Sequence, residues 1–401
     1  AEGIAVLVSE QDLDFAAATD TITIEGDMSG FTGRITARGS GGNWRFYRFA
    51  TPGSPAAAFD LGTNGATMLT RNGNTTVRLG SLAGDATTKL TGASSVTGAL
   101  TTYEIGGNHA STTFDGLIED NARPAPVAIR KIGAGTLTLT AASTYTGPTR
   151  IEEGTLALTG FASIGSSSLF EVAASAALDL TGLADPTLYL MNAGQTIAGA
   201  GTIRGNINAG AGTAVTPGSP VGTLTVTGSI VLDGTTVMEL DRALTPNSDR
   251  IVASGITANY VGALVVTNVG GRLSAGDQFQ LFSRAVSGGL AAIELPSTDA
   301  SGATYTWENN LATDGSIRVV TASGGIPDTP TRLTVATTAP GTLTVSWPAD
   351  YIGWSLESQT NSLSAGLGTN WTRVAGSNMT NVFEIPVNTD HGAVFYRMAL
   401  P

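Results

Sequence analysis

The sequence holds few side chains that could carry acid–base or nucleophilic chemistry. Its two histidines, His109 and His391, lie far apart in the chain, in segments that we assign to different domains. A catalytic triad is therefore not expected, because its histidine must contact both the nucleophile and the orienting carboxylate. The chain has no cysteine, which excludes thiol nucleophiles, thiolate zinc sites and disulfide bonds.

Close pairs of carboxylates, which glycosidases use as acid and base, occur twice in the sequence. One pair is Asp12 with Asp14, and the other is Glu152 with Glu153. The second pair directly precedes Gly154 at a predicted turn, where both carboxylates are expected to be solvated. No compact set of acid and base is visible, so the sequence predicts that the chain is not an enzyme. A polysaccharide-degrading enzyme ranks last among the functions considered.

Oxygen ligands for a divalent cation are concentrated near the N-terminus. Asp12, Asp14, Asp20 and Asp27 could bind Ca²⁺ from loops, or could simply form an acidic surface. They lack the ligand spacing of an EF-hand loop, and the nonapeptide repeat that binds Ca²⁺ in secreted proteins is absent as well. The sequence therefore predicts no cofactor and leaves a structural Ca²⁺ ion open.

Aromatic side chains supply two candidate regions for contact with a glycan. The run Asn43–Phe49 is the most aromatic of the chain, and Trp44 and Tyr47 within it could stack on sugar rings. The alternative is a buried strand whose side chains alternate between two faces. Trp371, near the C-terminus, is the other candidate for a glycan contact at the surface.

The composition bears on the classes of partner. The 401 residues carry a formal net charge of −12, and Lys89 and Lys131 are the two lysines. Nucleic acids and anionic membranes require a basic face, so neither is an expected partner. No run of about 18 apolar residues occurs, so no membrane span is expected. The 52 glycines and many threonines and valines indicate an all-β chain with tight turns.

A hexapeptide in which apolar residues alternate with threonine recurs along the chain. It begins at Gly135 as Gly-Thr-Leu-Thr-Leu-Thr, and related copies begin at Gly154, Gly222 and Gly341. Alternation with period two predicts strands whose leucines and valines share one face. A short strand is also predicted over Thr149–Glu152, which makes the step between equivalent strands about 20 residues.

Such a step indicates a β-solenoid, in which each coil stacks on the one before it and none can bury its apolar face alone. Leu137, Leu139, Leu156 and Leu158 are expected to point into this stack. About 15 coils, at about 4.8 Å per rung, would form a rod about 70 Å long.

A family resemblance is carried by three stretches of this region: Lys131-Ile-Gly-Ala-Gly-Thr-Leu-Thr-Leu-Thr140, Thr144-Tyr-Thr-Gly147 and Gly154-Thr-Leu-Ala-Leu158. They resemble the passenger-associated transport repeat, also called the autotransporter-associated β-strand repeat. This copy has Ser143 where Asn is usual. The resemblance implies an extracellular, right-handed β-helix of the kind found in surface-displayed or secreted bacterial proteins.

The composition of the sequence changes near the C-terminus, where Trp347, Trp354 and Trp371 cluster. Short strands that alternate with turns are predicted there. This segment resembles a fibronectin type III-like module, for example in Leu343-Thr-Val-Ser-Trp347. We predict an all-β fold in which a right-handed β-helical solenoid is followed by a small β-sandwich. Its parts are a cap with irregular coils over 1–110, the solenoid with the repeat over 111–322, a linker over 323–331 and the sandwich over 332–401.

The predicted function is that of a non-catalytic structural protein, secreted to the extracellular space or the cell surface. It is expected to form a homo-oligomer, as a fibre, sheath or surface layer, through exposed β-edges. Ile4, Val6 and Val8 alternate along a strand that could complete the sheet of a neighbouring copy. The alternative is a surface adhesin or polysaccharide-binding protein that uses the exposed aromatic residues.

Overall fold

The computed structural model describes residues 13–16, 21–38, 42–46, 52–71, 73–327, 330–362, 366–388, 390 and 392–400. Contacts divide the chain into two units, which are described separately. The first comprises Ala1–Val269, Phe279–Leu295 and Asn309–Ile317, and the second comprises Gly270–Gln278, Pro296–Glu308 and Arg318–Pro401. Almost all of the regular structure is β-strand, as the sequence predicts.

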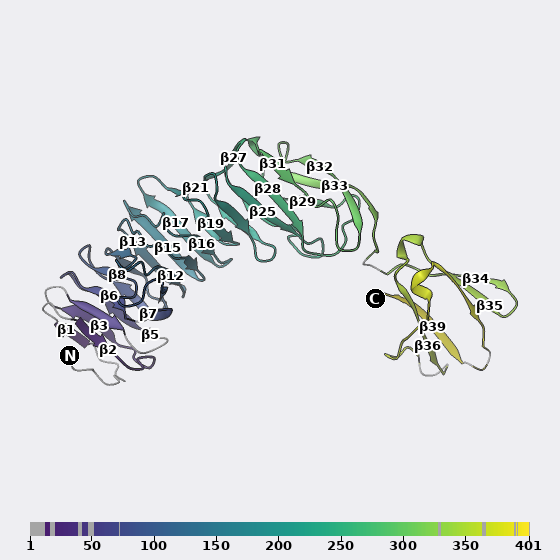
Figure 1. The fold of residues 1–401 in the computed structure, drawn as a ribbon, viewed down its shortest axis with the longest axis horizontal. Helices are drawn as coiled ribbons and strands as arrows, with labels where there is room; N and C mark the ends of the chain where they lie inside the picture. The colour runs from purple at the N-terminus through teal and green to yellow at the C-terminus, as the bar shows by residue number, and fades with distance from the viewer. Residues whose placement is uncertain are drawn as a thin grey trace. The chain divides into compact units, whose positions relative to one another are not determined.

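The first unit is a β-solenoid built around one long parallel sheet (Figure 1). The chain returns to this sheet once per coil, so each strand between the two end strands pairs with the equivalent strand of the coils before and after. In spatial order its 13 strands are β1 (Leu13–Ala16), β3 (Arg34–Arg38), β5 (Gly53–Asp60), β7 (Thr75–Ala83), β9 (Thr101–Ile105), β12 (Val127–Lys131), β14 (Thr149–Ile151), β16 (Leu169–Val172), β19 (Thr196–Gly199), β22 (Ala214–Pro217), β25 (Thr235–Leu240), β28 (Ala263–Asn268) and β31 (Ala292–Glu294).

Three shorter parallel sheets form the remaining faces of the coils. The N-terminal five-stranded sheet contains β11 (Leu117–Glu119), β8 (Lys89–Thr91), β6 (Thr67–Thr70), β4 (Asn43–Phe46) and β2 (Thr21–Ile24). The seven-stranded sheet contains β10 (Thr112–Phe114), β13 (Thr136–Leu139), β15 (Gly154–Gly160), β17 (Ala176–Leu183), β20 (Thr202–Arg204), β23 (Thr223–Val226) and β26 (Arg250–Val252). The C-terminal five-stranded sheet contains β18 (Thr187–Leu190), β21 (Asn206–Ala209), β24 (Ser229–Leu232), β27 (Gly255–Asn259) and β30 (Ser287–Gly289).

The inward-facing leucines of the hexapeptides form the core that the sequence predicts. Leu137 pairs with Leu156, and Leu139 pairs with Leu158, on adjacent rungs. All four side chains are at most 2% exposed. Each therefore has an apolar neighbour on the next rung, and the two leucines of one strand share the inward face because successive side chains point to opposite faces.

The coils are longer and fewer than the sequence predicts. Paired residues lie 18 apart at Ile197 and Val215, and 30 apart at Thr257 and Ser287. The strands stay short while the turns between them vary, so a fixed step of about 20 residues underestimates most coils. The long sheet has 13 described strands instead of the 15 coils predicted. Twelve steps of about 4.8 Å make this sheet about 60 Å long.

Stacked glycines form one corner of the solenoid within the repeat. Gly133 and Gly154 both adopt a left-handed backbone, with φ of 69°. A Cβ atom on Gly133 would lie 2.1 Å from the carbonyl oxygen of Gly106, one rung below. The corner therefore needs glycine for two reasons, the positive φ and the close approach of the neighbouring rung.

Lys131 lies inside this same corner and ties two rungs together. Its ammonium group donates hydrogen bonds to the carbonyl oxygens of Ile132 (2.8 Å), Gly133 (2.6 Å) and Glu153 (3.2 Å). Burial lowers the pKa of Lys131 to about 8, although the charge of Glu153 opposes the shift. The side chain therefore remains mainly protonated at neutral pH and satisfies three carbonyls that the turn leaves unpaired.

The second unit contains two antiparallel sheets near the C-terminus. One consists of β34 (Thr334–Ala339), β35 (Thr342–Ser346) and β38 (Val382–Pro386), and the other of β37 (Thr372–Arg373), β36 (Ser355–Asn361) and β39 (Ala393–Ala399). Two short 3₁₀ helices, η1 (Ala349–Tyr351) and η2 (Ser377–Met379), lie in the connections. A further three-stranded sheet has the order β29 (Gln278–Gln280), β33 (Ser316–Gly324) and β32 (Ala303–Asn310).

The two C-terminal sheets share one apolar core. Val345 of β35 packs in the same cluster as Trp347, Trp354, Leu356 of β36 and Met398 of β39. Short strands separated by turns are present in this segment as expected, and Trp347 is a core residue. The likeness of this module to fibronectin type III remains a prediction. β33 continues to Gly324, into the segment that the sequence assigns to a linker.

Replacing Gly133 with alanine is expected to destabilise the solenoid by about 3 kcal/mol or more, because a left-handed alanine costs about 1–2 kcal/mol and the methyl group also clashes with the rung below. Gly98 is the matched control, since its φ is 74° but no atom lies within 4 Å of its added Cβ. Gly98→Ala should lose only the free energy of unfolding that a left-handed alanine costs, because its methyl group meets no neighbouring atom. Urea unfolding of both variants measures the difference, and equal losses would show that the stacked corner is not tightly packed.

Candidate functional site

Polar side chains form rows on the outer face of the N-terminal five-stranded sheet. Asn43 and Arg45 point outward because Trp44, between them, points into the solenoid. Asn43 pairs with Thr67, and Thr67 pairs with Lys89. These residues come from three successive coils, and the in-register pairing spaces their side chains about 4.8 Å apart along the solenoid.

These rows form the floor of a hollow of about 420 Å³. The wall consists of the segment 119–122, which begins at the last residue of β11, together with Ser94. The lining contains threonine, asparagine and serine side chains, two cations and two carboxylates, with Leu69 as the largest apolar residue. It contains no aromatic side chain among the described residues.

The wall of the hollow is held in place by the carboxylate of Asp120. One oxygen of Asp120 accepts the backbone N–H groups of Val127 (2.9 Å) and Thr146 (3.1 Å). The other accepts the hydroxyl of Thr146 at 2.6 Å. The backbone N–H of Asn121 donates to Ala125 at 3.1 Å. The wall is therefore ordered by the fold itself and does not depend on a ligand.

The charged groups of the hollow balance one another. The ammonium of Lys89 donates to the carboxylate of Glu119 at 2.9 Å. The guanidinium of Arg45 donates to the hydroxyl of Thr23 at 2.8 Å, and Asp120 is the second carboxylate. Two cations and two carboxylates leave the lining without a strong net field for an ionic ligand.

Two polar atoms of the lining residues have no hydrogen-bond partner among the described residues. They are Nε of Arg45 and the hydroxyl oxygen of Thr91, and both atoms are buried. Thr91 is 7% exposed and faces outward, since Leu90 beside it points into the core. A buried polar group without a partner costs roughly 1–3 kcal/mol, so these atoms are unusual features of a folded surface.

Of the residues proposed to contact a glycan, Trp44 lies in the interior. It is 2% exposed and continues an inward row with Met68 and Leu90 of the next coils. The prediction of a surface contact by Trp44 is therefore wrong, and the alternative of a buried strand is correct for Trp44 and Phe46. Tyr47 lies outside the described residues.

Trp371 is half-buried at the surface of the C-terminal module. The guanidinium of Arg397 lies 4.2 Å from the centre of its ring, which is a cation–π contact. Arg397 also donates to the carboxylate of Glu357 at 2.9 Å. One face of Trp371 is thus occupied by the protein, and its role in binding a glycan stays a prediction.

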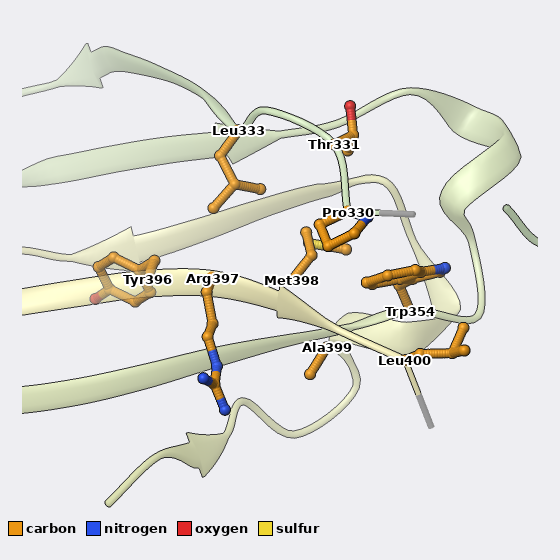
Figure 2. Close-up of a pocket in the computed structure, with 9 residues that line it drawn as sticks. All are labelled: Pro330, Thr331, Leu333, Trp354, Tyr396, Arg397, Met398, Ala399 and Leu400. Carbon is orange, nitrogen blue, oxygen red and sulfur yellow. The ribbon is translucent and has the colours of Figure 1, made fainter. Parts of the chain in front are cut away.

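A cleft of about 620 Å³ opens beside β39 in the same module. Figure 2 shows Leu333, Trp354 and Tyr396 around it, with Met398 and Leu400 further along β39. The cleft is mainly apolar and reaches the core, because Trp354 and Met398 belong to the buried cluster. Its chemistry suits an extended apolar segment better than a polar metabolite.

A buried carboxylate lies at a third hollow, of about 460 Å³, beside the long sheet. Asp249 is 1% exposed, and its two oxygens accept the backbone N–H groups of Gly222 (2.8 Å) and Glu239 (2.9 Å). Burial raises the pKa of Asp249 to about 7, and the charge of Glu239 adds to the shift, while the two N–H donors oppose it. Both oxygens accept backbone hydrogen bonds, so the carboxylate joins two segments of the chain and has a structural role.

The other candidates for acid–base chemistry also have structural roles. Nδ1 of His109 accepts the backbone N–H of Ala134 at 3.1 Å, and His391 lies outside the described residues. Glu152 accepts two hydrogen bonds from Arg130, at 2.7 and 2.8 Å, which places it at a solvated corner with a partner. Neither His109 nor Glu152 lines any of the three hollows described above.

The residues considered for Ca²⁺ are only partly described. Asp12 and Asp20 lie outside the described residues, and Asp27 accepts the backbone N–H of Ser29 at 2.9 Å. In the described part of the chain, no group of three or more His, Cys, Asp or Glu side chains could hold a metal ion. No helix there is long and apolar enough to cross a membrane.

The segment that contains the stacked corner is similar in sequence to a known protein family. Residues 129–158 match the passenger-associated transport repeat family. The repeat begins in β12, passes through β13 and β14 and ends in β15, so it covers two stacked strands of the long sheet and two of the seven-stranded sheet. It includes Lys131, Gly133 and Gly154 of the corner. No curated protein matches the chain.

Sequence reasoning missed the hollow on the N-terminal five-stranded sheet and the buried Asp249. Asn43, Thr67 and Lys89 stand 22 to 24 positions apart, and no local motif joins them. Asp249 stands in no motif that marks it in the sequence. To locate the hollow or the partners of Asp249, one must know which residues pair between neighbouring coils. The sequence indicates this pairing only where the hexapeptide recurs.

The buried Asp249 predicts a stability that depends on pH. Its pKa in the folded state lies above its pKa in the unfolded state, so the folded protein binds the additional proton between about pH 4 and 7. The free energy of unfolding should therefore fall as the pH rises through this range, by roughly 2–4 kcal/mol from this group. Above pH 7 the contribution should stay constant.

Asp249→Asn should remove this part of the pH dependence, and unfolding of both proteins at several pH values between 4.5 and 8 measures it. The readout is the slope of the free energy of unfolding against pH, not its absolute value. The asparagine amide can accept only one of the two N–H hydrogen bonds, so the variant is expected to be less stable at every pH. Parallel curves for the two proteins would contradict a raised pKa at Asp249.

Proposed function

We propose that the chain is a non-catalytic structural protein of the bacterial cell surface or extracellular material, which assembles with copies of itself into a fibre, sheath or layer. The proposal is supported most directly by open sheet edges. Among the described residues, β1 and β31 each pair with a single neighbour in the long sheet, and β39 pairs with β36 alone. Such edges present unpaired backbone groups that another strand can bind.

The use of the charged side chains supports a structural role. Arg78, Glu104 and Arg130 stand in register on successive rungs of the long sheet. Arg130 donates to Glu104 at 2.6 Å and to Glu152 at 2.7 Å, and these contacts raise its pKa. These charges bind one coil to the next, which favours a rigid rod over a reactive surface.

Export to the cell surface is supported by the match of residues 129–158 to the passenger-associated transport repeat. The composition agrees with this location, since the chain is acidic and has no cysteine that depends on a reducing compartment. The stacked corner at Gly133 lies within the matched residues, so the repeat and the solenoid describe the same feature of the chain.

Ile4, Val6 and Val8 supply the donor strand in this proposal. They lie outside the described residues, so the argument rests on their alternation in the sequence. An extended apolar segment of this kind adds to an exposed edge through backbone hydrogen bonds and through alternate side chains that enter a groove. The apolar cleft beside β39 offers such a groove next to an open edge.

Val6→Asp is expected to abolish assembly, because a carboxylate would replace an apolar side chain that enters the groove of the neighbouring copy. Ser9→Asp is the matched control, with the same charge placed beyond the alternating segment. Sedimentation velocity and negative-stain microscopy of the full chain measure the outcome. Wild-type monomers at high concentration would contradict self-assembly, whereas assembly by the Val6 variant would contradict only the donor strand.

A surface adhesin or polysaccharide-binding protein is the second candidate function. It is favoured by the polar hollow on the N-terminal five-stranded sheet, whose lining is rich in hydrogen-bonding groups. Trp371 remains a proposed glycan contact in the C-terminal module. The two functions are compatible, because a surface rod can both assemble and bind a polymer.

A further inference from the structure

The rows that line the hollow on the N-terminal five-stranded sheet run along the solenoid. Asn43, Thr67 and Lys89 belong to one row, and Arg45 and Leu69 pair in the row beside it. Each step moves to the next coil and presents another side chain at about the same spacing. A linear ligand with repeating units could lie along both rows and contact several coils, whereas a compact metabolite would contact few of these groups.

The chemistry of the lining selects a neutral ligand rich in hydroxyl groups. Asn43 and Arg45 offer N–H donors, Glu119 offers acceptor oxygens, and Thr67 and Thr91 can do both. Hydroxyl groups match this mixture because each of them donates and accepts. The balanced charges, with Lys89 held by Glu119, give no preference for an anionic or cationic polymer.

The unpartnered atoms point to the hollow as a site for a ligand. Nε of Arg45 and the hydroxyl of Thr91 do not stabilise the fold through hydrogen bonds, because neither has a partner among the described residues. Thr91 is nine-tenths buried, lines the hollow and pairs with Glu119 on the next rung. A ligand hydroxyl or a water held by it would supply the missing partner.

The size and the rigidity of the hollow agree with such a site. Its volume of about 420 Å³ lies within the range of ligand pockets, about 300–1,000 Å³. Its wall is fixed by the three contacts of Asp120 to Val127 and Thr146. Little ordering is therefore required on binding, which reduces the entropic cost.

We propose that this hollow binds a segment of a neutral polysaccharide, laid along the solenoid and held by Asn43, Arg45, Thr67, Lys89 and Thr91. The site is separate from the edges that carry the assembly proposal, so either can hold without the other. It makes the solenoid a receptor for an uncharged surface or matrix polymer.

The test uses the full chain in native gels that contain dissolved polysaccharide. The probes are three neutral polymers, dextran, xylan and hydroxyethyl cellulose, and two acidic ones, alginate and polygalacturonate. The wild-type protein is expected to be retarded by at least one neutral polymer and by neither acidic polymer. Retardation by none of the neutral polymers, or by the acidic polymers alone, would overturn the proposal.

Thr91→Val is the informative variant, because valine keeps the shape and removes the unpartnered hydroxyl. Its binding should weaken about 5-fold, which corresponds to one lost hydrogen bond of about 1 kcal/mol. Its melting temperature should be unchanged or higher, because a buried group without a partner has been removed. A purely structural threonine would instead give a lower melting temperature and unchanged binding, and that result would contradict the site.

Thr236→Val is the matched control. Its hydroxyl is also buried and unpartnered, but Thr236 lies in β25 of the long sheet, away from the lining residues. The same chemical change there should leave the retardation unaltered. Asn43→Ala should weaken binding as Thr91→Val does, and equal retardation of all three variants and the wild type would show that the hollow is not the binding site.

Discussion

The structure of the solenoid depends on the in-register stacking of short parallel strands, one coil upon the next. A single coil cannot bury its leucines, so Leu137 requires Leu156 and Leu156 requires Leu178 on the following rung. This pairing also fixes the backbone hydrogen bonds, because each interior strand of the long sheet both donates to and accepts from its two neighbours. The glycine corner at Gly133 and the ammonium of Lys131 are consequences of the same close approach between rungs.

The register that buries the leucines also arranges the outer face. Once an inward side chain is aligned with its neighbour, the residues before and after it are aligned as well. Trp44 aligns with Met68, and so Asn43 aligns with Thr67 and Arg45 with Leu69. The polar hollow is therefore a product of the core. Its side chains are close in space although they are distant in the sequence, because the register places them on adjacent rungs.

The sequence is sufficient for much of the fold where its pattern is strong. The hexapeptide at Gly135 and Gly154 predicts two strands, their inward leucines and their stacking, and the family resemblance agrees with the matched residues. The strands of the C-terminal module are likewise visible, because turns separate short apolar runs around Trp347 and Trp354. In both regions the local alternation and the tertiary packing favour the same structure.

The pattern is weaker elsewhere, and there the sequence misleads or is silent. The number of coils was overestimated because the loops between the strands vary in length and make most coils longer than 20 residues. Trp44 was assigned to two alternatives, since alternation shows that Asn43 and Trp44 face opposite sides but not which side is the interior. Asp249 could not be recognised because its partners, the N–H groups of Gly222 and Glu239, come from separate segments of the chain.

The distribution of the two lysines has a practical consequence for experiments on this molecule. Nζ of Lys131 is enclosed by three carbonyl oxygens, whereas the Lys89 side chain is 44% exposed and lies at the polar hollow. Reagents directed at primary amines therefore meet one accessible lysine side chain in the described part of the chain. A fluorophore coupled there would report directly on the environment of the hollow, without any engineered attachment point.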